Sequence, residues 1–101
     1  MNELLKNRIH AVRNLCNAYK VRDLFAFGSV LTDRFSDKSD IDFLVSFTDE
    51  VPLLDYADNY FDFKDKLSKL LGRDIDLVME SSLSNPFFIK AIERTKTRIY
   101  G

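Results

Sequence analysis

Hydrophobic residues recur along this chain at two different spacings, and each spacing is typical of one kind of secondary structure. In the first segment Leu5, Ile9 and Val12 follow one another at intervals of three and four residues, as on one face of a helix. Farther along, short runs of Val, Ile, Leu and Phe are nearly continuous or alternate with polar residues, which is typical of strands. The pattern predicts helices at 2–19, 53–71 and 87–98, and strands at 21–27, 40–47 and 73–79.

The strand predicted at 40–47 has the most buried pattern. Its alternating side chains form two faces, with Ile41, Phe43, Val45 and Phe47 on one and Asp40, Asp42, Leu44 and Ser46 on the other. After Asp42 both faces are largely apolar. We therefore expect a central strand that is covered on both sides.

The ends of two predicted helices carry typical residues. Pro52 suits the first turn of helix 53–71, and Gly72 stands where a left-handed C-terminal cap belongs. Asn85 followed by Pro86 favours another helix start. The helix that follows is basic, with Lys90, Arg94, Lys96 and Arg98. These cations either contact a substrate phosphate or an acidic partner, or they form ordinary helix surface.

Composition narrows the class of protein. The chain has 101 residues, which predicts a single domain over 1–101. The formal net charge of -1 disfavours a nonspecific nucleic-acid binder. Cys16 is the single cysteine, so no internal disulfide is expected. The sequence contains no apolar run of membrane-spanning length and no signal-peptide pattern, so we expect a cytoplasmic protein that makes no membrane contact.

The stretch from Gly28 to Asp42 carries the candidate chemistry. Asp40 and Asp42 are one residue apart, so on a strand their carboxylates point to the same face. Because like charges side by side repel each other, a cation between them would stabilise the arrangement. Hard carboxylate oxygens suit Mg²⁺. The alternative is a solvated strand end that binds no ligand.

A Gly-Ser pair precedes these carboxylates. Gly28 permits a close approach of the backbone to a ligand, and the residues from Ser29 onward suit a short helix with free N–H groups. The alternative is a plain turn. In the polar loop 33–39, Arg34 and Lys38 are candidates for contact with a phosphate, with surface solvation as the alternative.

A third carboxylate lies within an otherwise apolar predicted strand. If strand 73–79 lies beside the strand that carries Asp40 and Asp42, Asp76 joins them in a three-carboxylate cluster. Asp74 is nearer the entrance of its strand and is the alternative for this place.

Such a cluster facing a Gly-Ser turn suits phosphoryl or nucleotidyl transfer. In this chemistry Asp40 and Asp42 bridge two metal ions, and Asp76 holds the catalytic metal and helps to deprotonate the acceptor hydroxyl. The backbone and hydroxyl of Gly28 and Ser29 hold the outer phosphates of a nucleoside triphosphate. Positioning and charge neutralisation supply most of the rate.

The order of these motifs resembles the signature of the polymerase-β-like nucleotidyltransferase superfamily, and the short length resembles its minimal members, the MNT proteins. The resemblance covers roughly residues 20–80, and the matching positions are Gly28, Ser29, Asp40, Asp42 and Asp76. Ten residues separate Gly-Ser from Asp-x-Asp, as in the family motif. One departure is that Leu31-Thr32-Asp33 replaces the Ala-Arg-Gly of many minimal members, with arginine at Arg34 instead.

This resemblance implies a fold, cofactors and a partner. It implies an α/β (α+β) fold in which helices pack against a small mixed β-sheet. It implies Mg²⁺, in two sites, and ATP or another nucleoside triphosphate as substrate. Minimal members often pair with HEPN-domain toxins, and there the MNT protein acts as antitoxin by transferring AMP to a toxin tyrosine.

Two functions from different classes remain open at this stage. The first is an enzyme that transfers a nucleoside monophosphate to a hydroxyl, with the acceptor surface supplied by a partner or by a second copy of the chain. The second is a non-catalytic binding module that neutralises its partner by occlusion. A DNA-binding regulator is disfavoured, because the chain lacks net positive charge and a clear helix-turn-helix pattern.

Overall fold

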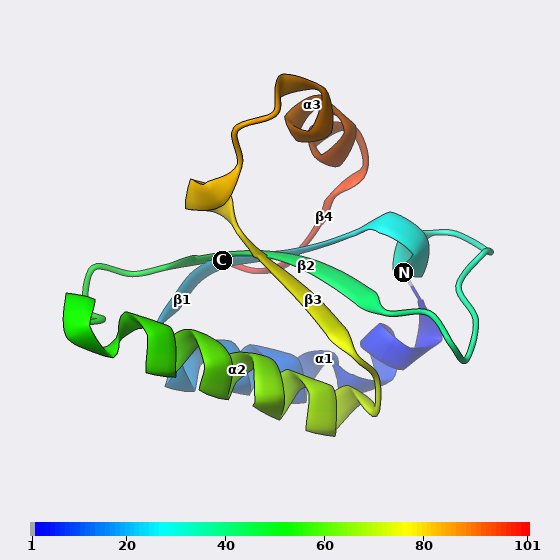
Figure 1. Ribbon diagram of the computed structural model, residues 1–101. Helices are drawn as coiled ribbons and strands as arrows, with labels where there is room; N and C mark the ends of the chain where they lie inside the picture. The colour runs from blue at the N-terminus through cyan, green and yellow to red at the C-terminus, as the bar shows by residue number, and fades with distance from the viewer. Residues whose placement is uncertain (1) are drawn as a thin grey trace.

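The computed structural model describes residues 2–101 (Figure 1). Its helices and strands are α1 (Glu3–Ala18), β1 (Val21–Phe27), β2 (Ile41–Phe47), α2 (Tyr56–Leu71), β3 (Ile75–Met79), α3 (Pro86–Thr95) and β4 (Thr97–Tyr100). Short 3₁₀ turns at Gly28–Leu31, Leu53–Asp55 and Glu80–Ser82 lie between them. The expected mixed α/β architecture is confirmed.

The strands form one mixed sheet in the order β3-β2-β1-β4. β2 runs parallel to β3 and antiparallel to β1, and β1 also pairs antiparallel with β4. β2 is therefore a central strand, as its apolar faces predict. The connection from β2 to β3 runs through α2, which is the usual way to join parallel neighbours.

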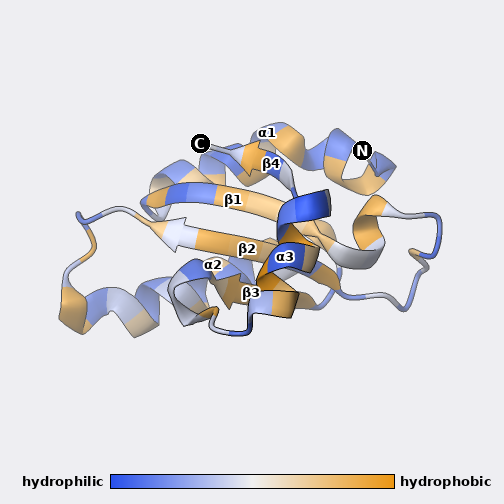
Figure 2. Ribbon diagram, turned by 90° about the horizontal axis from the view of Figure 1, so that it is seen from above, coloured by the Kyte–Doolittle hydropathy of each residue, from blue (hydrophilic) through white to orange (hydrophobic). Residues whose placement is uncertain are grey.

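Helices cover both faces of the sheet. α1 and α2 contact each other on one face, and α3 lies over the other (Figure 1). The larger core cluster, beneath α1 and α2, includes Leu5, Val12, Cys16, Ile41, Phe43, Phe63, Leu67 and Leu71. The smaller cluster, beneath α3, contains Phe25, Phe27, Leu44 and Ile92. Figure 2 shows the hydrophobic colouring along the middle strands that these two layers cover.

The helix ends follow the predicted chemistry. Gly72 has φ of 65° and ends α2 in the left-handed conformation. The side chain of Asn85 accepts hydrogen bonds from the N–H groups of Phe87 and Phe88, and Pro86 occupies the first turn of α3. Pro52 differs from expectation, because it precedes a 3₁₀ turn and the α-helix begins only at Tyr56.

The prediction of a helix over 87–98 is wrong at its end. α3 stops at Thr95, and residues 97–100 form β4, which pairs with the edge of β1. Burial of the Ile99 side chain and hydrogen bonds to β1 stabilise the extended conformation of this segment. These contacts are with distant residues, so the local sequence pattern does not indicate them. Lys96 and Arg98 are consequently not helix surface. Their cations lie over the ring of Phe25, 4.2 and 4.6 Å from its centroid.

The single cysteine is a core residue. Burial raises the pKa of the Cys16 thiol to about 12, so the side chain packs as a small apolar group. Within residues 2–101, no helix combines the length and the apolar character needed to cross a membrane.

The packing of α2 predicts unequal effects of two nearby phenylalanines. Phe63 is fully buried, with its ring centroid 5.8 Å from that of Tyr19 and 6.0 Å from that of Phe47, whereas Phe61 is 62% exposed. We expect Phe63→Ala to lower the free energy of unfolding by about 3–5 kcal/mol, because it leaves a cavity. Phe61→Ala should change it by about 0.5 kcal/mol or less. Urea denaturation followed by circular dichroism measures both, and equal losses would contradict the packing described.

Candidate active site

Two aspartates lie directly opposite each other on neighbouring strands. The parallel register of β2 and β3 pairs Asp42 with Asp76. The pKa of Asp42 is raised to about 6. Burial is the largest cause, and the negative charges of Asp76 and Asp40 add to it. A side-chain hydrogen bond with Asp76 acts in the same direction. The half-buried Asp42 carboxylate is thus the centre of an uncompensated negative cluster.

Asp40 stands immediately before β2 and is exposed to solvent. The N–H of Ile41 donates to the carbonyl of Asp74 at 3.0 Å, which ties this strand entrance to the entrance of β3. The register therefore gives Asp76 the place beside Asp42. Asp74 lies one pair earlier, and its side chain lines surface pockets beside α2 residues such as Ser68.

Gly28 lies close to Asp42, at the start of the turn that follows β1. It follows Phe27, the β1 partner of Asp42 in the antiparallel register, and its φ of +76° lies in the left-handed region. A Cβ atom built on Gly28 would overlap a carboxylate oxygen of Asp42. Backbone conformation and close approach therefore both require glycine here.

The Gly-Ser pair opens a 3₁₀ turn, in agreement with the short helix considered from the sequence. The turn is closed by Thr32, whose N–H and hydroxyl each donate to the carbonyl of Ser29 at 2.9 Å. A surface pocket of about 390 Å³ adjoins it, lined by Gly28, Ser29, Leu31, Thr32, Arg34 and Thr95. The structure thus places Arg34 beside the Gly-Ser turn. Lys38 lies elsewhere, in a pocket with Asp40.

Thr95 enters this pocket without any signal in the sequence. It is the last residue of α3, and only the packing of that helix over the sheet brings it beside residues about 65 positions earlier. No motif surrounds it. The residues around Thr95 in the sequence therefore give no indication of its place in this pocket.

A larger pocket of about 620 Å³ lies at the opposite end of β1 and β2. Its lining contains Arg13, Arg22 and Arg98 together with backbone and apolar neighbours, and it contains no aspartate or glutamate. Size alone would select this pocket. At this end Asp23 and Asp49 are paired with Arg98 and Arg22. The carboxylates of Asp42 and Asp76 meet at the other end of the strands, so that end is the candidate site for metal and phosphate chemistry.

The donor chemistry at the acidic end fits Mg²⁺. Within the described chain, no three Asp, Glu, His or Cys side chains converge closely enough to form a complete protein cage for a metal ion. Mg²⁺ seldom needs such a cage, because it is usually held by one or two carboxylates, water and substrate phosphates. Besides burial, the negative charges of Asp76 and Asp40 contribute to the raised pKa of Asp42, and a cation bound among these carboxylates would offset those charges.

Comparison with known proteins gives concordant results. The nucleotidyltransferase domain family model matches residues 10–99. A protein adenylyltransferase candidate of Methanocaldococcus jannaschii is 44% identical over 75 residues, which cover 74% of this chain and 72% of that protein. The solved structure of a candidate minimal nucleotidyltransferase is 34% identical with a TM-score of 0.74, covering 96% of this chain and 95% of the other.

A more distant structure shares the fold. It is a chain from the complex of tri-AMPylated Shewanella oneidensis HEPN toxin with MNT antitoxin, at 20% identity and a TM-score of 0.65, covering 95% of this chain and 71% of that chain. The domain model and the two more similar proteins extend well beyond the motif region, and the resemblance stated from the sequence is confirmed. The chain belongs to the nucleotidyltransferase domain family, as a nucleotidyltransferase that matches the minimal members in fold and length.

Proposed function

We propose that this nucleotidyltransferase transfers AMP from ATP to a tyrosine hydroxyl of a HEPN-type toxin and so acts as its antitoxin. The observation that carries the proposal is the pairing of Asp42 with Asp76, together with the close approach of the side-chain-free Gly28 to the Asp42 carboxylate. The adenylyltransferase name of the Methanocaldococcus relative supports AMP as the transferred group. The complex of an AMPylated HEPN toxin with an MNT antitoxin supports the partner.

The Gly-Ser turn and its pocket suit the triphosphate. The backbone of Gly28 and the hydroxyl of Ser29 would bind the outer phosphates, because no side chain separates this backbone from the ligand. Arg34 lines the same pocket and carries a fork of N–H donors that matches phosphate oxygens. The triphosphate would thereby lie with its α-phosphate toward the aspartates.

The acidic cluster suits the metal and the proton transfer. Asp40, Asp42 and Asp76 would hold Mg²⁺, which supplies charge neutralisation at the reacting phosphate when it is bound. The tyrosine oxygen forms a bond to the α-phosphorus, the bond from that phosphorus to the bridging oxygen breaks, and pyrophosphate leaves. The exposed carboxylate of Asp76 accepts the hydroxyl proton.

An open site suits an acceptor from another molecule. Both Asp40 and Asp76 are exposed, so a tyrosine on a partner surface can reach them without a movement of the core. Large apolar side chains also lie exposed on this small domain, namely Leu53, Leu54, Phe61, Phe87 and Phe88. Exposed apolar side chains of this kind are suited to contacts with a partner protein.

The proposal predicts label transfer from ATP to the toxin. Purified protein, a purified HEPN-type toxin, Mg²⁺ and ATP labelled at the α-phosphate should give a labelled toxin band. We expect Asp42→Asn to abolish the label, because it removes a ligand of the metal. Asp49→Asn, which changes an exposed aspartate just beyond the far end of β2, should leave transfer unchanged.

The label-transfer experiment has two informative failures. Label on RNA in place of protein would move the acceptor to nucleic acid. Absence of label, combined with neutralisation of the toxin by a variant that has all three aspartates changed to asparagine, would establish occlusion as the mechanism instead.

The raised pKa of Asp42 predicts that removing its charge stabilises the fold. An unfolded aspartate ionises near pH 4, whereas folded Asp42 ionises near pH 6, so ionisation opposes folding increasingly between these values and fully above them. Solvent screens this partly exposed carboxylate, so we expect Asp42→Asn to raise the free energy of unfolding by about 1 kcal/mol at pH 7.5. At pH 4 the gain should nearly vanish.

Urea titrations at both pH values measure the effect of Asp42→Asn, with Asp49→Asn as the matched control. Mg²⁺ should raise the melting temperature of the native protein more than that of Asp42→Asn, because ligand binding stabilises the folded state. If Mg²⁺ raises the melting temperature of both proteins equally, Asp42 is not a ligand of the metal.

The two cations of the loop should differ in their effect on ATP. Arg34 lines the pocket beside the Gly-Ser turn, whereas Lys38 does not. We expect Arg34→Ala to raise the KM for ATP about tenfold, the effect of losing one charge-assisted hydrogen bond to phosphate. Lys38→Ala should leave KM within about twofold. Steady-state kinetics at saturating Mg²⁺ measure both KM values. A larger rise in KM for Lys38→Ala than for Arg34→Ala would mean that Lys38, and not Arg34, contacts the phosphates.

A further inference from the structure

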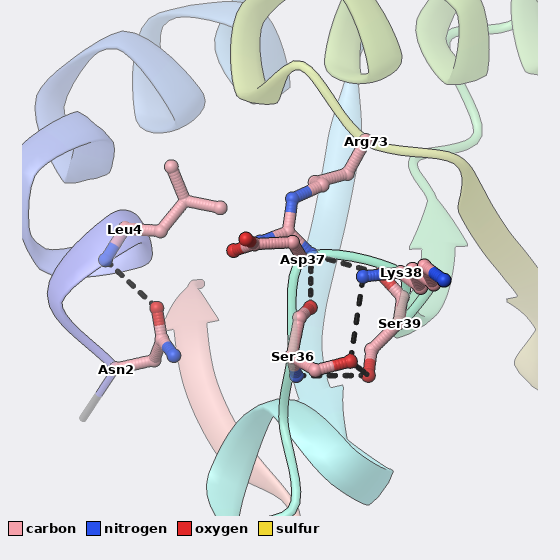
Figure 3. A network of polar contacts seen from close by, with 7 residues as sticks. All are labelled: Asn2, Leu4, Ser36, Asp37, Lys38, Ser39 and Arg73. Atoms are coloured by element: carbon pink, nitrogen blue, oxygen red, sulfur yellow. Dashed lines mark hydrogen bonds and ion pairs between the residues drawn. The ribbon is translucent and has the colours of Figure 1, made fainter.

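Arg73 makes several contacts with the loop that leads into the acidic site (Figure 3). Its Nη1 donates to the carbonyl of Ser36 at 2.7 Å and to the carbonyl of Ser39 at 3.0 Å. Its Nη2 lies 3.9 Å from the carboxylate of Asp37, and the guanidinium stacks 4.5 Å from the ring centroid of Phe35. The Arg73 side chain is only 17% exposed. It therefore anchors the loop through two carbonyls, one ion pair and one aromatic ring.

Apart from Phe35, which is partly buried against the larger core cluster, the loop makes few contacts with the rest of the domain. Its other hydrogen bonds are local, such as Ser36 N–H to the hydroxyl of Ser39 at 3.0 Å and Lys38 N–H to the hydroxyl of Ser36 at 3.3 Å. Over residues 33–39, the hydrogen bonds to a distant segment are those from Arg73. Removing that side chain would leave residues 36–39 with local hydrogen bonds alone, and Phe35 as the loop's contact with the core.

The backbone of Arg73 is itself fixed by the end of α2. Its N–H donates to the carbonyl of Ser68 at 3.3 Å, and its carbonyl accepts from the hydroxyl of Ser68 at 2.7 Å. Arg73 lies three residues before Asp76, and the chain enters β3 at Ile75. On the other side of the contact, Ser39 immediately precedes Asp40. One side chain thus joins the two segments that deliver the outer carboxylates of the candidate site.

We propose that Arg73 is a positioning residue that holds Asp40 in register with Asp42 and Asp76 for metal binding. This inference rests on the proposed function, because it concerns the same site. Three carboxylates repel one another when no cation lies between them, so the exposed Asp40 needs an external tie to stay near its partners. The planar guanidinium serves two carbonyls and a ring at once, which an ammonium group does not.

The experiment combines a metal titration with hydrogen exchange. Mg²⁺ alone is titrated into the nucleotide-free protein by calorimetry, and exchange of the amides of residues 36–41 is followed by NMR. We expect Arg73→Gln to weaken Mg²⁺ binding about tenfold, in the range seen when residues that orient metal ligands are removed. The loop amides should exchange faster while the amides of α1 keep their protection. Arg73→Lys should also weaken Mg²⁺ binding, to a smaller extent.

Arg22→Gln is the matched control, since this exposed arginine lies at the opposite end of the sheet and pairs with Asp49 there. It should match the native protein in both measurements. In the label-transfer assay, Arg73→Gln should lower kcat with little change in the KM for ATP, and excess Mg²⁺ should restore part of the rate. Because Mg²⁺ binding also stabilises the folded state, a native far-UV circular dichroism spectrum of Arg73→Gln without Mg²⁺ is needed to exclude loss of folding as the cause.

Several results would contradict a positioning role for Arg73. Native Mg²⁺ affinity in Arg73→Gln, or faster exchange throughout the domain, would make Arg73 a structural residue only. Full native behaviour of Arg73→Lys would exclude the planar guanidinium as the cause. If the native protein itself binds no Mg²⁺, the metal part of the proposed function fails. Separately, if the loop amides of Arg73→Gln exchange at the native rate, Arg73 does not hold the loop in place.

Discussion

The hydrogen-bonded register between β2 and β3 is the constraint on which the candidate site depends. It sets Asp42 beside Asp76, and the antiparallel register on the other side of β2 sets Phe27 beside Asp42. A slip of one residue between the strands would exchange their faces and bury an aspartate beneath the helices. The apolar side chains of Ile41 and Phe43 oppose that slip, because they are fully buried in the observed register and a slip would turn them to the other face.

The core and the acidic cluster act in opposite directions on stability. Apolar side chains beneath α1, α2 and α3 favour folding, whereas the half-buried Asp42 disfavours it when ionised. Such a cluster is stable in a small domain only because it lies at one end of the sheet, where solvent reaches Asp40 and Asp76. The same exposure leaves the carboxylates open to a cation and to a substrate. Under the proposed function, activity and stability would place opposite demands on this strand end.

Three segments that are far apart in the chain meet at this end. The turn after β1 contributes Gly28, whose missing side chain makes room for Asp42. The loop before β2 contributes Asp40, and it is attached through Arg73 to the segment between α2 and β3. Each segment holds another in place, so the site is a property of the assembled sheet. The short helix α3 completes it by placing Thr95 in the wall of the neighbouring pocket.

Local sequence determined much of this protein, because caps, turns and strand faces depend on neighbouring residues. The positions of β1 and β2, the cap at Gly72 and the start of α3 at Asn85 follow from such signals. The spacing from Gly28 to Asp42 likewise indicated the chemistry and the family before any contact was known. The family resemblance had already selected Asp76, and the strand register places it opposite Asp42. Tertiary structure alone decided that Arg34 and not Lys38 lines the Gly-Ser pocket, and that residues 97–100 leave the helix for the sheet. These outcomes depend on hydrogen bonds and packing between segments distant in the chain, and the order of residues within one segment carries no information about that pairing.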